Sequence, residues 1–306
     1  TLMAGFRPLL LNLRLDDATL APVEQLAAGV LTDRPRAGCI DLSAAGDAAG
    51  FTPVWADEIA LMTSGTTGTP KLVLYDGAAI TAQLLQSESI VRKCPEVKHD
   101  RLARELRMLA FLPFYHIFVL MASLLWFIFF GVTFVFLERY DSRSIQYACK
   151  VGRVTHFFAV PAVWEQTARQ LLREAERQGQ KEKLLRAVRF SNGLQSVFPR
   201  LGARLARRVL FRRVREQALG TEPMFCISGG GFLQPQAAEL MNGLGYGMHN
   251  GYGMTETGIL SVELSRRAKW RLSGGVGLPL QALSGGWRIA EDGVLELRSP
   301  LLYTAM

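Results

Sequence analysis

Short runs of aliphatic, aromatic and β-branched residues recur along the chain, and between them apolar residues return at every third or fourth position. Runs of the first kind are typical of buried strands, and spacing of the second kind is typical of helices that bury one face. Because the two kinds alternate, the pattern predicts an α/β fold in which mostly parallel sheets are flanked by helices. Strands are predicted within 58–64, 71–77, 107–112, 155–161, 224–230 and 246–253, and helices within 78–93, 162–219 and 234–245.

The stretch from Phe118 to Leu137 contains twenty residues without a charge, which is long enough to cross a membrane as one helix. Gly131 interrupts it, and a β-branched and aromatic cluster follows at 132–136. A helix of about a dozen residues, a glycine turn and a buried strand fit this order better than one continuous helix. A membrane anchor is the alternative, and recovery of the protein without detergent would exclude it.

The helical spacing ends after Ser265, so the rest of the chain is expected to be β-rich. The segment "WRIAEDGVLELRSP" has two strand-like runs on either side of Asp292-Gly293, a dipeptide that favours a hairpin turn. We therefore expect one large core over 1–306, with an α/β part at about 56–264 and a β-rich part at 265–306.

The positive charge of the chain is concentrated in one segment. The whole chain carries +8, whereas the residues from Glu165 to Glu216 hold fourteen basic and only five acidic side chains. Within it, Leu201, Leu205, Val209 and Val214 have helical spacing, which predicts an amphipathic helix with a basic solvent face. A patch for a membrane surface or an acidic partner is the alternative. Among the arginines of this helix the only aromatic residue is Phe211, which is not the series of stacking rings that single-stranded nucleic acid needs, so nucleic acid is disfavoured as the partner.

Composition and cysteine spacing narrow the class of protein. The chain has 306 residues and 49% hydrophobic content, which is ordinary for a soluble α/β protein. Its four cysteines lie far apart without a C-x-x-C pair, so we expect reduced, mostly buried thiols and neither a zinc site nor a disulfide framework. The first residues do not resemble a signal peptide, which makes the cytoplasm the expected location.

The segment "TSGTTGTPK" combines hydroxyl groups, glycines and one lysine between two predicted strands. Glycines let backbone N–H groups approach an anion closely, hydroxyls add donors and the lysine adds a charge, which together predict a polyanion site. The segment is not a G-x-x-x-x-G-K-[ST] loop, because Pro70 precedes the lysine and Leu72 follows it. A flexible turn is the alternative. The candidate anion-binding residues are Thr63, Ser64, Gly65, Thr66, Thr67, Gly68 and Lys71.

Three further segments carry candidate chemistry. In "NGYGMTETG", Tyr252 offers a ring on which a base could stack, Thr255 a donor to a phosphate and Glu256 a ligand for Mg²⁺, although a lone aromatic or Glu in a loop is usually structural. In "LPFYHIF", His116 ends a predicted strand, where a packed histidine is the ordinary interpretation. In "ISGGGFL", a flat ligand could lie against the bare backbone of Gly229, Gly230 and Gly231.

These segments, in this order, resemble the motifs of the adenylate-forming superfamily, which includes acyl- and aryl-CoA synthetases, luciferases and the adenylation domains of peptide synthetases. "TSGTTGTPK" resembles its phosphate loop, "LPFYHIF" its acyl-site motif, "SGGG" its adenine-side loop and "NGYGMTE" its nucleotide signature. The resemblance spans about residues 56–305. It implies the α/β fold of the large N-terminal domain of these enzymes.

For the phosphates and the metal, the resemblance implies specific residues. Ser64, Thr66, Thr67 and Lys71 would hold the β- and γ-phosphates of ATP and later the departing pyrophosphate. Glu256, together with Thr67, would bind Mg²⁺. The residues implied to be catalytic are Lys71, His116, Thr255 and Glu256.

The resemblance also implies which residues bind the rest of the nucleotide and the substrate acid. Tyr252 would stack on adenine opposite the three glycines, and Asn250 would bond the adenine amino group. Thr255 would touch the α-phosphate, and His116 would border the carboxylate and the acyl tunnel. The full set implied to bind the nucleotide at this motif is Asn250, Gly251, Tyr252, Gly253, Met254 and Thr255.

The implied reaction is attack of a carboxylate on the α-phosphorus, which gives acyl-AMP and pyrophosphate, followed by acyl transfer to CoA or to the phosphopantetheine of a carrier protein. Because the carboxylate is already a nucleophile, positioning and charge neutralisation supply most of the catalysis. Tyr115-His116 replaces the Phe-Asp pair of amino-acid-activating members, which favours an acyl or aryl acid.

The chain departs from the family pattern at its end. It stops before the positions of the ribose-binding aspartate, the hinge and the small C-terminal lid domain with its catalytic lysine. The resemblance therefore implies a core without the lid, incomplete for the full cycle. Two alternatives follow: an acyl-AMP ligase that loads a carrier protein, docked by the basic helices near 200–216, and a non-catalytic core that binds nucleotide or acyl-adenylate.

Overall fold

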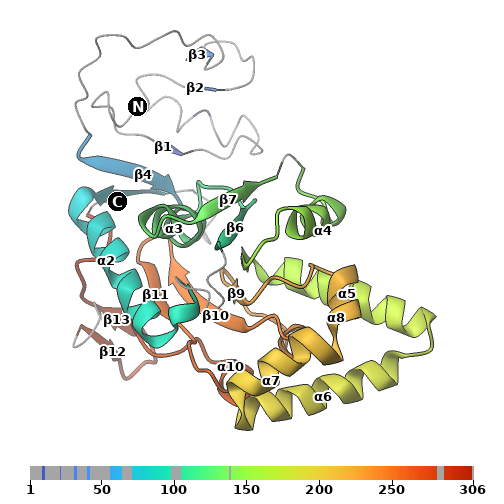
Figure 1. Cartoon of the computed structure of the whole chain (residues 1–306). Helices are drawn as coiled ribbons and strands as arrows, with labels where there is room; N and C mark the ends of the chain where they lie inside the picture. The colour runs from blue at the N-terminus through green and yellow to red at the C-terminus, as the bar shows by residue number, and fades with distance from the viewer. Residues whose placement is uncertain are drawn as a thin grey trace. The chain divides into compact units, whose positions relative to one another are not determined.

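The computed structural model describes residues 9–10, 21, 31–32, 40–41, 56–63, 71–97, 105–137, 139–280 and 286–304 (Figure 1). The chain divides into two compact units. The smaller unit comprises 1–77 together with 303–306, and the larger unit comprises 78–302.

The smaller unit contains a three-stranded sheet built on a hairpin. Strands β4 (Glu58–Met62) and β5 (Leu72–Asp76) pair antiparallel, and β1 (Leu9–Leu10) joins β4 in parallel. Leu61 and Val73 face each other in this register and are fully buried, because the two apolar runs bury the same face. The two strands predicted around "TSGTTGTPK" are thus confirmed. A separate parallel pair joins β2 (Leu31–Thr32) and β3 (Ile40–Asp41).

The larger unit is organised around a six-stranded sheet in the order β11-β10-β9-β8-β6-β7. All neighbours are parallel except β11, which runs antiparallel to β10. This arrangement confirms the predicted α/β class with a mostly parallel sheet. The strands are β6 (Arg107–Ala110), β7 (Thr133–Phe136), β8 (His156–Ala159), β9 (Phe225–Ser228), β10 (Met248–Met254) and β11 (Gly258–Val262).

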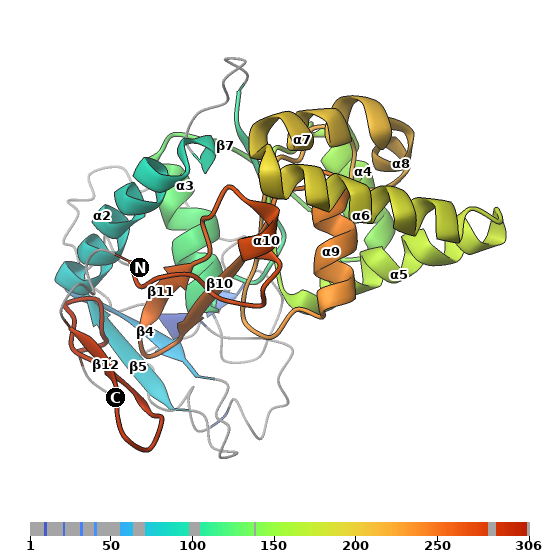
Figure 2. The same cartoon turned by 90° about the horizontal axis from the view of Figure 1, so that it is seen from below.

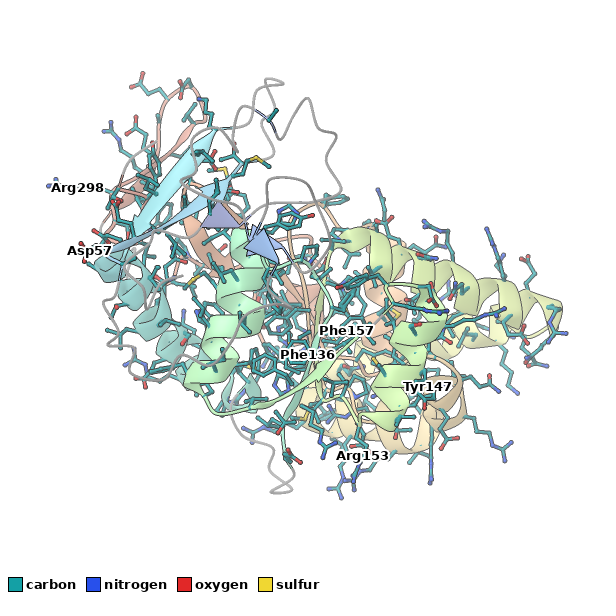
Figure 3. All side chains as sticks on the ribbon, turned by 90° about the horizontal axis from the view of Figure 1, so that it is seen from above. Asp57, Phe136, Tyr147, Arg153, Phe157 and Arg298 are labelled. Atoms are coloured by element: carbon teal, nitrogen blue, oxygen red, sulfur yellow. The ribbon has the colours of Figure 1, made fainter. Side chains whose placement is uncertain are left out.

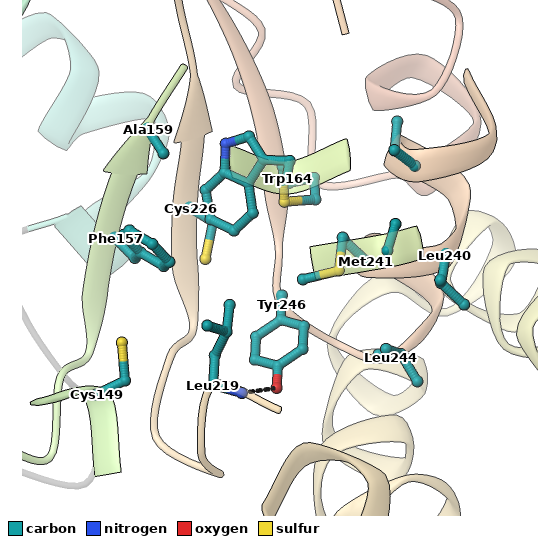
Figure 4. Close-up of a cluster of buried hydrophobic side chains, with 14 of the residues drawn as sticks. Cys149, Phe157, Ala159, Trp164, Leu219, Cys226, Leu240, Met241, Leu244 and Tyr246 are labelled. Atoms are coloured by element: carbon teal, nitrogen blue, oxygen red, sulfur yellow. Dashed lines mark hydrogen bonds between the residues drawn. The ribbon is translucent and has the colours of Figure 1, made fainter. Parts of the chain in front are cut away.

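One face of this sheet packs against α4 (Ser142–Val151), α5 (Pro161–Arg177) and α9 (Pro235–Gly243). Figure 4 shows the centre of this layer, where Phe157 of β8 contacts Trp164 of α5 with ring centroids 4.7 Å apart. Tyr246 is fully buried beside them, and its hydroxyl accepts a hydrogen bond from the backbone N–H of Leu219 at 3.2 Å. This packing is the hydrophobic core of the larger unit.

The cysteines that the structure describes are buried, as the sequence predicts. Cys94, Cys149 and Cys226 are free thiols and buried, whereas Cys39 lies outside the described residues. Burial raises the pKa of the Cys149 thiol to about 12, so this side chain packs as a small neutral group.

The opposite face of the sheet packs against a helical segment made of η3 (Val119–Leu125) and α3 (Trp126–Phe129). The Phe127 ring lies 5.3 Å from the ring of His156 and 5.5 Å from that of Phe158. Behind it, the indole N–H of Trp126 donates to the carbonyl oxygen of Gln83 in α2 (Gly77–Lys93), 3.2 Å away. Figure 2 shows α2 and α3 on one side of the larger unit and α5 to α9 on the other.

The uncharged stretch folds largely as predicted. A helical segment over 119–129 is followed by Gly131, whose φ of +68° forms the turn into β7. The expectation of a buried strand was wrong, because β7 is the edge strand of its sheet and Phe136 is 63% exposed. Within the described residues, no helix is long and apolar enough to cross a membrane.

The long helical region after Pro161 is confirmed, but its last part differs from the predicted amphipathic helix. Leu201 and Val209, placed on the buried face by their spacing, are 62% and 67% exposed. Arg215, assigned to the solvent face, is fully buried, because its guanidinium donates to three backbone carbonyls and lies 3.9 Å above the Tyr246 ring. The elements are α6 (Lys181–Val197), α7 (Pro199–Leu205), η4 (Ala206–Leu210) and α8 (Arg212–Gln217).

The last part of the larger unit contains the predicted hairpin. Strands β12 (Trp287–Ile289) and β13 (Leu295–Leu297) pair antiparallel, and Gly293 adopts a φ of +83° in the turn between them. The expectation that helices stop after Ser265 was wrong, because the short helix α10 (Ala268–Arg271) follows it. Its Arg271 is buried, and the guanidinium donates to the side-chain oxygen of Asn242 at 2.8 Å.

His249 in β10 is expected to make folding sensitive to acid. Its ring is buried between Phe225 and the carbonyl of Glu263, and this burial lowers its pKa to about 3. In the unfolded chain the pKa returns to about 6.5, so between these values the unfolded state binds the extra proton and stability falls as pH falls. We expect the free energy of unfolding to lose up to about 1.4 kcal/mol per pH unit from this residue.

The measurement is urea unfolding of the chain and of His249→Gln, which keeps an N–H donor for the Glu263 carbonyl, at steps from about pH 7 to pH 4. The slope of stability against pH should be shallower in the variant. Equal slopes would contradict a neutral buried His249.

Candidate active site

The carboxyl ends of β6, β8, β9 and β10 lie along one edge of the six-stranded sheet, because these strands are parallel. Ala159, Ser228 and Asn250 are aligned there as neighbours in the ladder. The segments that leave this edge include "LPFYHIF", "SGGG" and "NGYGMTE". In open α/β sheets, ligands bind at the carboxyl ends of the strands. The fold therefore gathers three of the four candidate segments at the edge where a ligand site is expected.

The glycine loop after β9 lies against an aromatic ring. A Cβ atom at Gly229 would stand 2.8 Å from the Phe118 ring, so only glycine allows this approach without a shift. The backbone N–H of Gly229 donates to the carbonyl of Ala159 at 3.2 Å, which holds the loop beside β8. Gly230 has a φ of +80°, and both Gly230 and Gly231 are exposed. The loop thus presents bare backbone to solvent, as a flat ligand requires.

The segment "NGYGMTE" lies in the β10–β11 hairpin, at the end of β10 and in the turn that follows. The strand expected within 246–253 is confirmed, but the glycine loop into which it was expected to run was wrong, because β10 continues through Tyr252 and Gly253 to Met254. The strand can continue because β11 pairs with this part of it, with an irregular register after Tyr252. Thr255, Glu256 and Thr257 form the tight turn at the tip.

Two hydrogen bonds and one close approach fix this tip. The hydroxyl of Thr257 accepts from the backbone N–H of Met254 at 3.1 Å, and the Thr257 N–H donates to the Met254 carbonyl at 3.2 Å. A Cβ atom at Gly253 would overlap the carbonyl oxygen of Gly258 across the hairpin. The chain is therefore held in one conformation on both sides of Glu256, which is half-buried.

The side chains along β10 are positioned to meet a ligand. Tyr252 is 37% exposed, which leaves its ring accessible for stacking. The Asn250 amide donates from Nδ2 to the carbonyl of Gly275 at 3.3 Å, which leaves Oδ1 as an acceptor. Gly251 lies beside the Phe118 ring, 3.8 Å from where its Cβ would stand. Phe118, Gly229 and Gly251 thus form one contact that joins all three segments.

His116 lies at the start of the helix that carries Phe118. Its carbonyl oxygen accepts hydrogen bonds from the N–H groups of Val119 and Leu120. The side chain is exposed, with the Tyr115 ring 4.3 Å away, so the alternative of a packed histidine was wrong. The structure shortens its strand to Arg107–Ala110, which leaves His116 in the segment beyond it. Partial desolvation lowers the pKa of His116 below its ordinary value, which favours the neutral ring.

The fourth segment belongs to the smaller unit. The hairpin β4–β5 closes at the pair Thr63 and Lys71, where the Thr63 N–H donates to the Lys71 carbonyl at 2.9 Å. The Thr63 hydroxyl accepts from the Lys71 N–H at 3.2 Å and is buried, whereas the Lys71 side chain is exposed. The remaining predicted residues, Ser64, Gly65, Thr66, Thr67 and Gly68, lie outside the described residues.

Two sets of positions matter to this site but were not singled out from the sequence. Phe118 lies in a segment that the sequence marks, yet only the structure shows its contact with the glycine loop. Gln83 and Gln86 of α2 are buried; their amides donate to the carbonyls of Leu301 at 3.1 Å and of Ile259 at 2.8 Å. Gln86 thereby holds α2 against the β11 strand of the hairpin, and Gln83 ties α2 to the segment after β13. A pair of glutamines at helical spacing gives no signal of this in the sequence.

Comparison with known proteins places these observations in a family. The chain is 26% identical over 233 residues to long chain acyl-CoA synthetase 6, peroxisomal, of Arabidopsis thaliana, a match that covers 75% of this chain and 31% of that protein. It is 29% identical over 254 residues to a long-chain-fatty-acid–CoA ligase of Mycobacterium bovis, which covers 80% of this chain and 40% of the ligase. The chain thus spans less than half the length of these curated relatives.

Solved structures show the same fold. The o-succinylbenzoate CoA synthetase of Bacillus subtilis in complex with its acyl-adenylate intermediate superposes with a TM-score of 0.67 at 18% identity, covering 99% of this chain and 56% of that one. A malonyl-CoA ligase complex superposes with a TM-score of 0.60 at 20% identity, covering 99% and 59%. The family model described as AMP-binding enzyme matches residues 16–290. The chain therefore belongs to the family of AMP-binding, adenylate-forming enzymes.

Proposed function

We propose that this chain is the core of an AMP-forming acid–thiol ligase, which activates a carboxylic acid with ATP. The observation that supports this most directly is the convergence of "LPFYHIF", "SGGG" and "NGYGMTE" at the carboxyl edge of the sheet, joined by the Phe118 ring. Membership of the AMP-binding family gives the same chemistry independently. The matched relatives are named as acyl-CoA synthetases or CoA ligases, which supports a thiol as the final acceptor.

The larger unit supplies groups that fit an adenine ring. The exposed Tyr252 ring offers one apolar surface, and the exposed backbone of Gly230 and Gly231 offers another. The adenine amino group is a donor and needs an acceptor, a role that Oδ1 of Asn250 fits because its Nδ2 already donates to Gly275. We assign these residues to nucleotide binding.

The hairpin tip supplies groups for the α-phosphate and the metal. Thr255 is assigned to the α-phosphate and Glu256 to Mg²⁺, which proteins commonly hold through one or two carboxylates with phosphate oxygens as the other ligands. Ser64, Thr66, Thr67 and Lys71 are assigned to the β- and γ-phosphates, with Thr67 also toward the metal. These assignments rest on the sequence motif, and Lys71 contributes an exposed charge at the base of its loop.

The reaction follows from these assignments. The substrate carboxylate attacks the α-phosphorus, the bond to the bridging oxygen breaks, and pyrophosphate leaves with its electron pair. No proton has to be removed from the nucleophile, so the protein contributes by alignment and by neutralising charge on the phosphates. His116 borders the acid in this arrangement, and its lowered pKa favours a neutral ring beside the carboxylate. A thiolate then displaces AMP from the acyl group.

We infer that the carboxylic acid substrate is a fatty acid. Both curated relatives are named for long-chain substrates, and the chain lacks the Phe-Asp pair that places an aspartate on an amino-acid ammonium group. CoA is the acceptor in the relatives' names, and a carrier-bound phosphopantetheine is the alternative. The cytoplasm stays the predicted location.

The test combines nucleotide binding with chemistry on the 306-residue chain. Calorimetry with Mg·ATP and ATP–pyrophosphate exchange with a series of fatty and aromatic acids should show binding and acid-dependent exchange. Binding without exchange for any acid would instead select a non-catalytic nucleotide-binding core. If the chain neither bound Mg·ATP nor catalysed exchange with any acid, the proposal would be overturned.

A further inference from the structure

The join between α6 and α7 carries an unusual set of exposed apolar side chains. On α6, the exposed positions Lys183, Arg186, Phe190 and Val197 recur at intervals of three, four and seven residues, so they share one face of the helix. After the join, Leu201 and Arg204 of α7 and Arg208 of η4 are exposed as well. The large apolar residues of α6, the join, α7 and η4 that are each more than half exposed are Phe190, Val197, Phe198, Leu201 and Val209.

The exposed side chains of α6, α7, η4 and the join between α6 and α7, which we call the basic–apolar surface, also include many cations. From Lys183 to Arg215 the chain has thirty-three residues with ten basic and no acidic side chains. Among the described residues, no carboxylate forms an ion pair with Arg186, Arg204 or Arg208. Their charges are therefore not neutralised within this part of the molecule.

Packing within the unit accounts for the buried side of these helices and not for the exposed side. Gly202 allows α7 to approach the α6 backbone, since a Cβ there would stand 2.8 Å from the Gln195 nitrogen. Ala206, Phe211 and Arg215 fill the interior side of the following turns. Leu201 and Val209 are left outside although their spacing is that of core residues. Several large apolar side chains gathered on a surface mark an interaction site.

We propose that the basic–apolar surface docks this protein on anionic lipid bilayers. A bilayer offers negative headgroups for the arginines and an apolar interior, immediately beneath them, for phenylalanine, leucine and valine side chains. The arrangement of the cations along two helical elements fits a fluid charged plane, which needs no matching shape. A site for single-stranded nucleic acid would need a series of aromatic rings stacked among the arginines, and here only Phe190 and Phe198 are exposed beside ten basic residues.

Docking on a bilayer fits the function proposed above, and the role that we give to the docking rests on that function. Long-chain fatty acids partition into bilayers, so an enzyme that activates them gains access to its substrate by sitting on the membrane. Vesicle binding is measured without any reaction. The docking proposal can therefore fail while the proposed ligase function holds, and the reverse is also possible.

The test is co-sedimentation of the 306-residue chain with phosphatidylcholine vesicles that contain or lack phosphatidylglycerol, at low and at physiological salt. We expect binding only with the anionic lipid and weaker binding at higher salt. The charge variant Arg186→Gln/Arg204→Gln/Arg208→Gln should bind on the order of 100-fold more weakly, from about fivefold for each charge removed. The apolar variant Phe190→Ser/Phe198→Ser/Leu201→Ser should lose at least about tenfold.

Matched controls make the result specific to this surface. Arg153→Gln/Arg266→Gln/Arg298→Gln removes three exposed arginines elsewhere, and Phe136→Ser/Tyr147→Ser/Ile289→Ser removes three exposed apolar groups elsewhere (Figure 3 labels four of these six positions). Thermal unfolding of every variant shows that it is folded. Binding retained by both controls and lost by both surface variants supports the proposal.

Several outcomes would overturn it. Equal loss in the charge control would show that net charge alone drives binding. Full binding by the apolar variant would exclude insertion into the bilayer. Absence of vesicle binding, with capture of an acidic acyl carrier protein that the charge variant abolishes, would assign the surface to a protein partner instead.

Discussion

Replacing Glu256 by glutamine is expected to lower acid-dependent ATP–pyrophosphate exchange by about 100-fold or more. The substitution keeps the size of the side chain and removes its charge, which in our assignment is the protein's ligand for the Mg²⁺ on the phosphates. The hairpin tip holds Glu256 between the Met254 and Thr257 hydrogen bonds, so the backbone should stay in place. Raising the Mg²⁺ concentration should recover part of the rate, because the defect is in metal binding.

Glu291→Gln is the matched control, since it removes an exposed carboxylate from the β12–β13 turn. Its exchange rate should equal that of the parent chain. The Lys71→Ala variant addresses the other half of the assignment and should also lose exchange, because it removes the cation assigned to the pyrophosphate. Full exchange in both Glu256→Gln and Lys71→Ala would refute the site as assigned here.

The Gly253→Ala variant should lose both stability and exchange. A Cβ atom at this position would overlap the Gly258 carbonyl oxygen, which is backbone and cannot rotate away as a flexible side chain could. The hairpin must therefore open at its tip, where Thr255 and Glu256 lie. Overpacking of this kind typically costs about 1–3 kcal/mol, and we expect the midpoint of thermal unfolding to fall accordingly.

The control for this prediction is Gly193→Ala, in the middle of α6. A Cβ there meets nothing within 4 Å, so the loss of backbone freedom in the unfolded chain should stabilise the protein by about 0.5–1 kcal/mol. Calorimetric unfolding of the two variants under the same conditions compares them. A destabilisation of Gly253→Ala no larger than the experimental error would show that the hairpin adapts.

The site could be anticipated from the sequence because its chemistry is concentrated in short contiguous segments. "NGYGMTE" contains an aromatic, a hydroxyl and a carboxylate within a few residues, and local order alone brings them near one another. The contact of Phe118 with Gly229 and Gly251 could not be anticipated in this way. It joins residues more than a hundred positions apart, and their distance depends on the order of the strands in the sheet.

Most of the secondary structure was likewise predictable, and its errors have a common cause. The strands at 58–62 and 72–76 and the turn at Asp292-Gly293 follow from local propensity and spacing. The buried strand expected after Gly131 became an edge strand, because the apolar run did not reveal that it has a neighbour on one side only. The continuation of β10 through the glycines of its motif, where a loop was expected, also depended on a partner, β11.

By itself, the sequence determined which residues share a helix or a strand, where the chain turns, and which segments carry groups suited to a magnesium nucleotide. The tertiary structure alone decided which face of each element packs against the rest of the protein: it buried Arg215 against the Tyr246 ring and left Leu201 and Val209 in solvent. The physical reason is that periodicity is a property of neighbouring residues, whereas burial depends on which distant elements supply hydrogen bonds and apolar contacts.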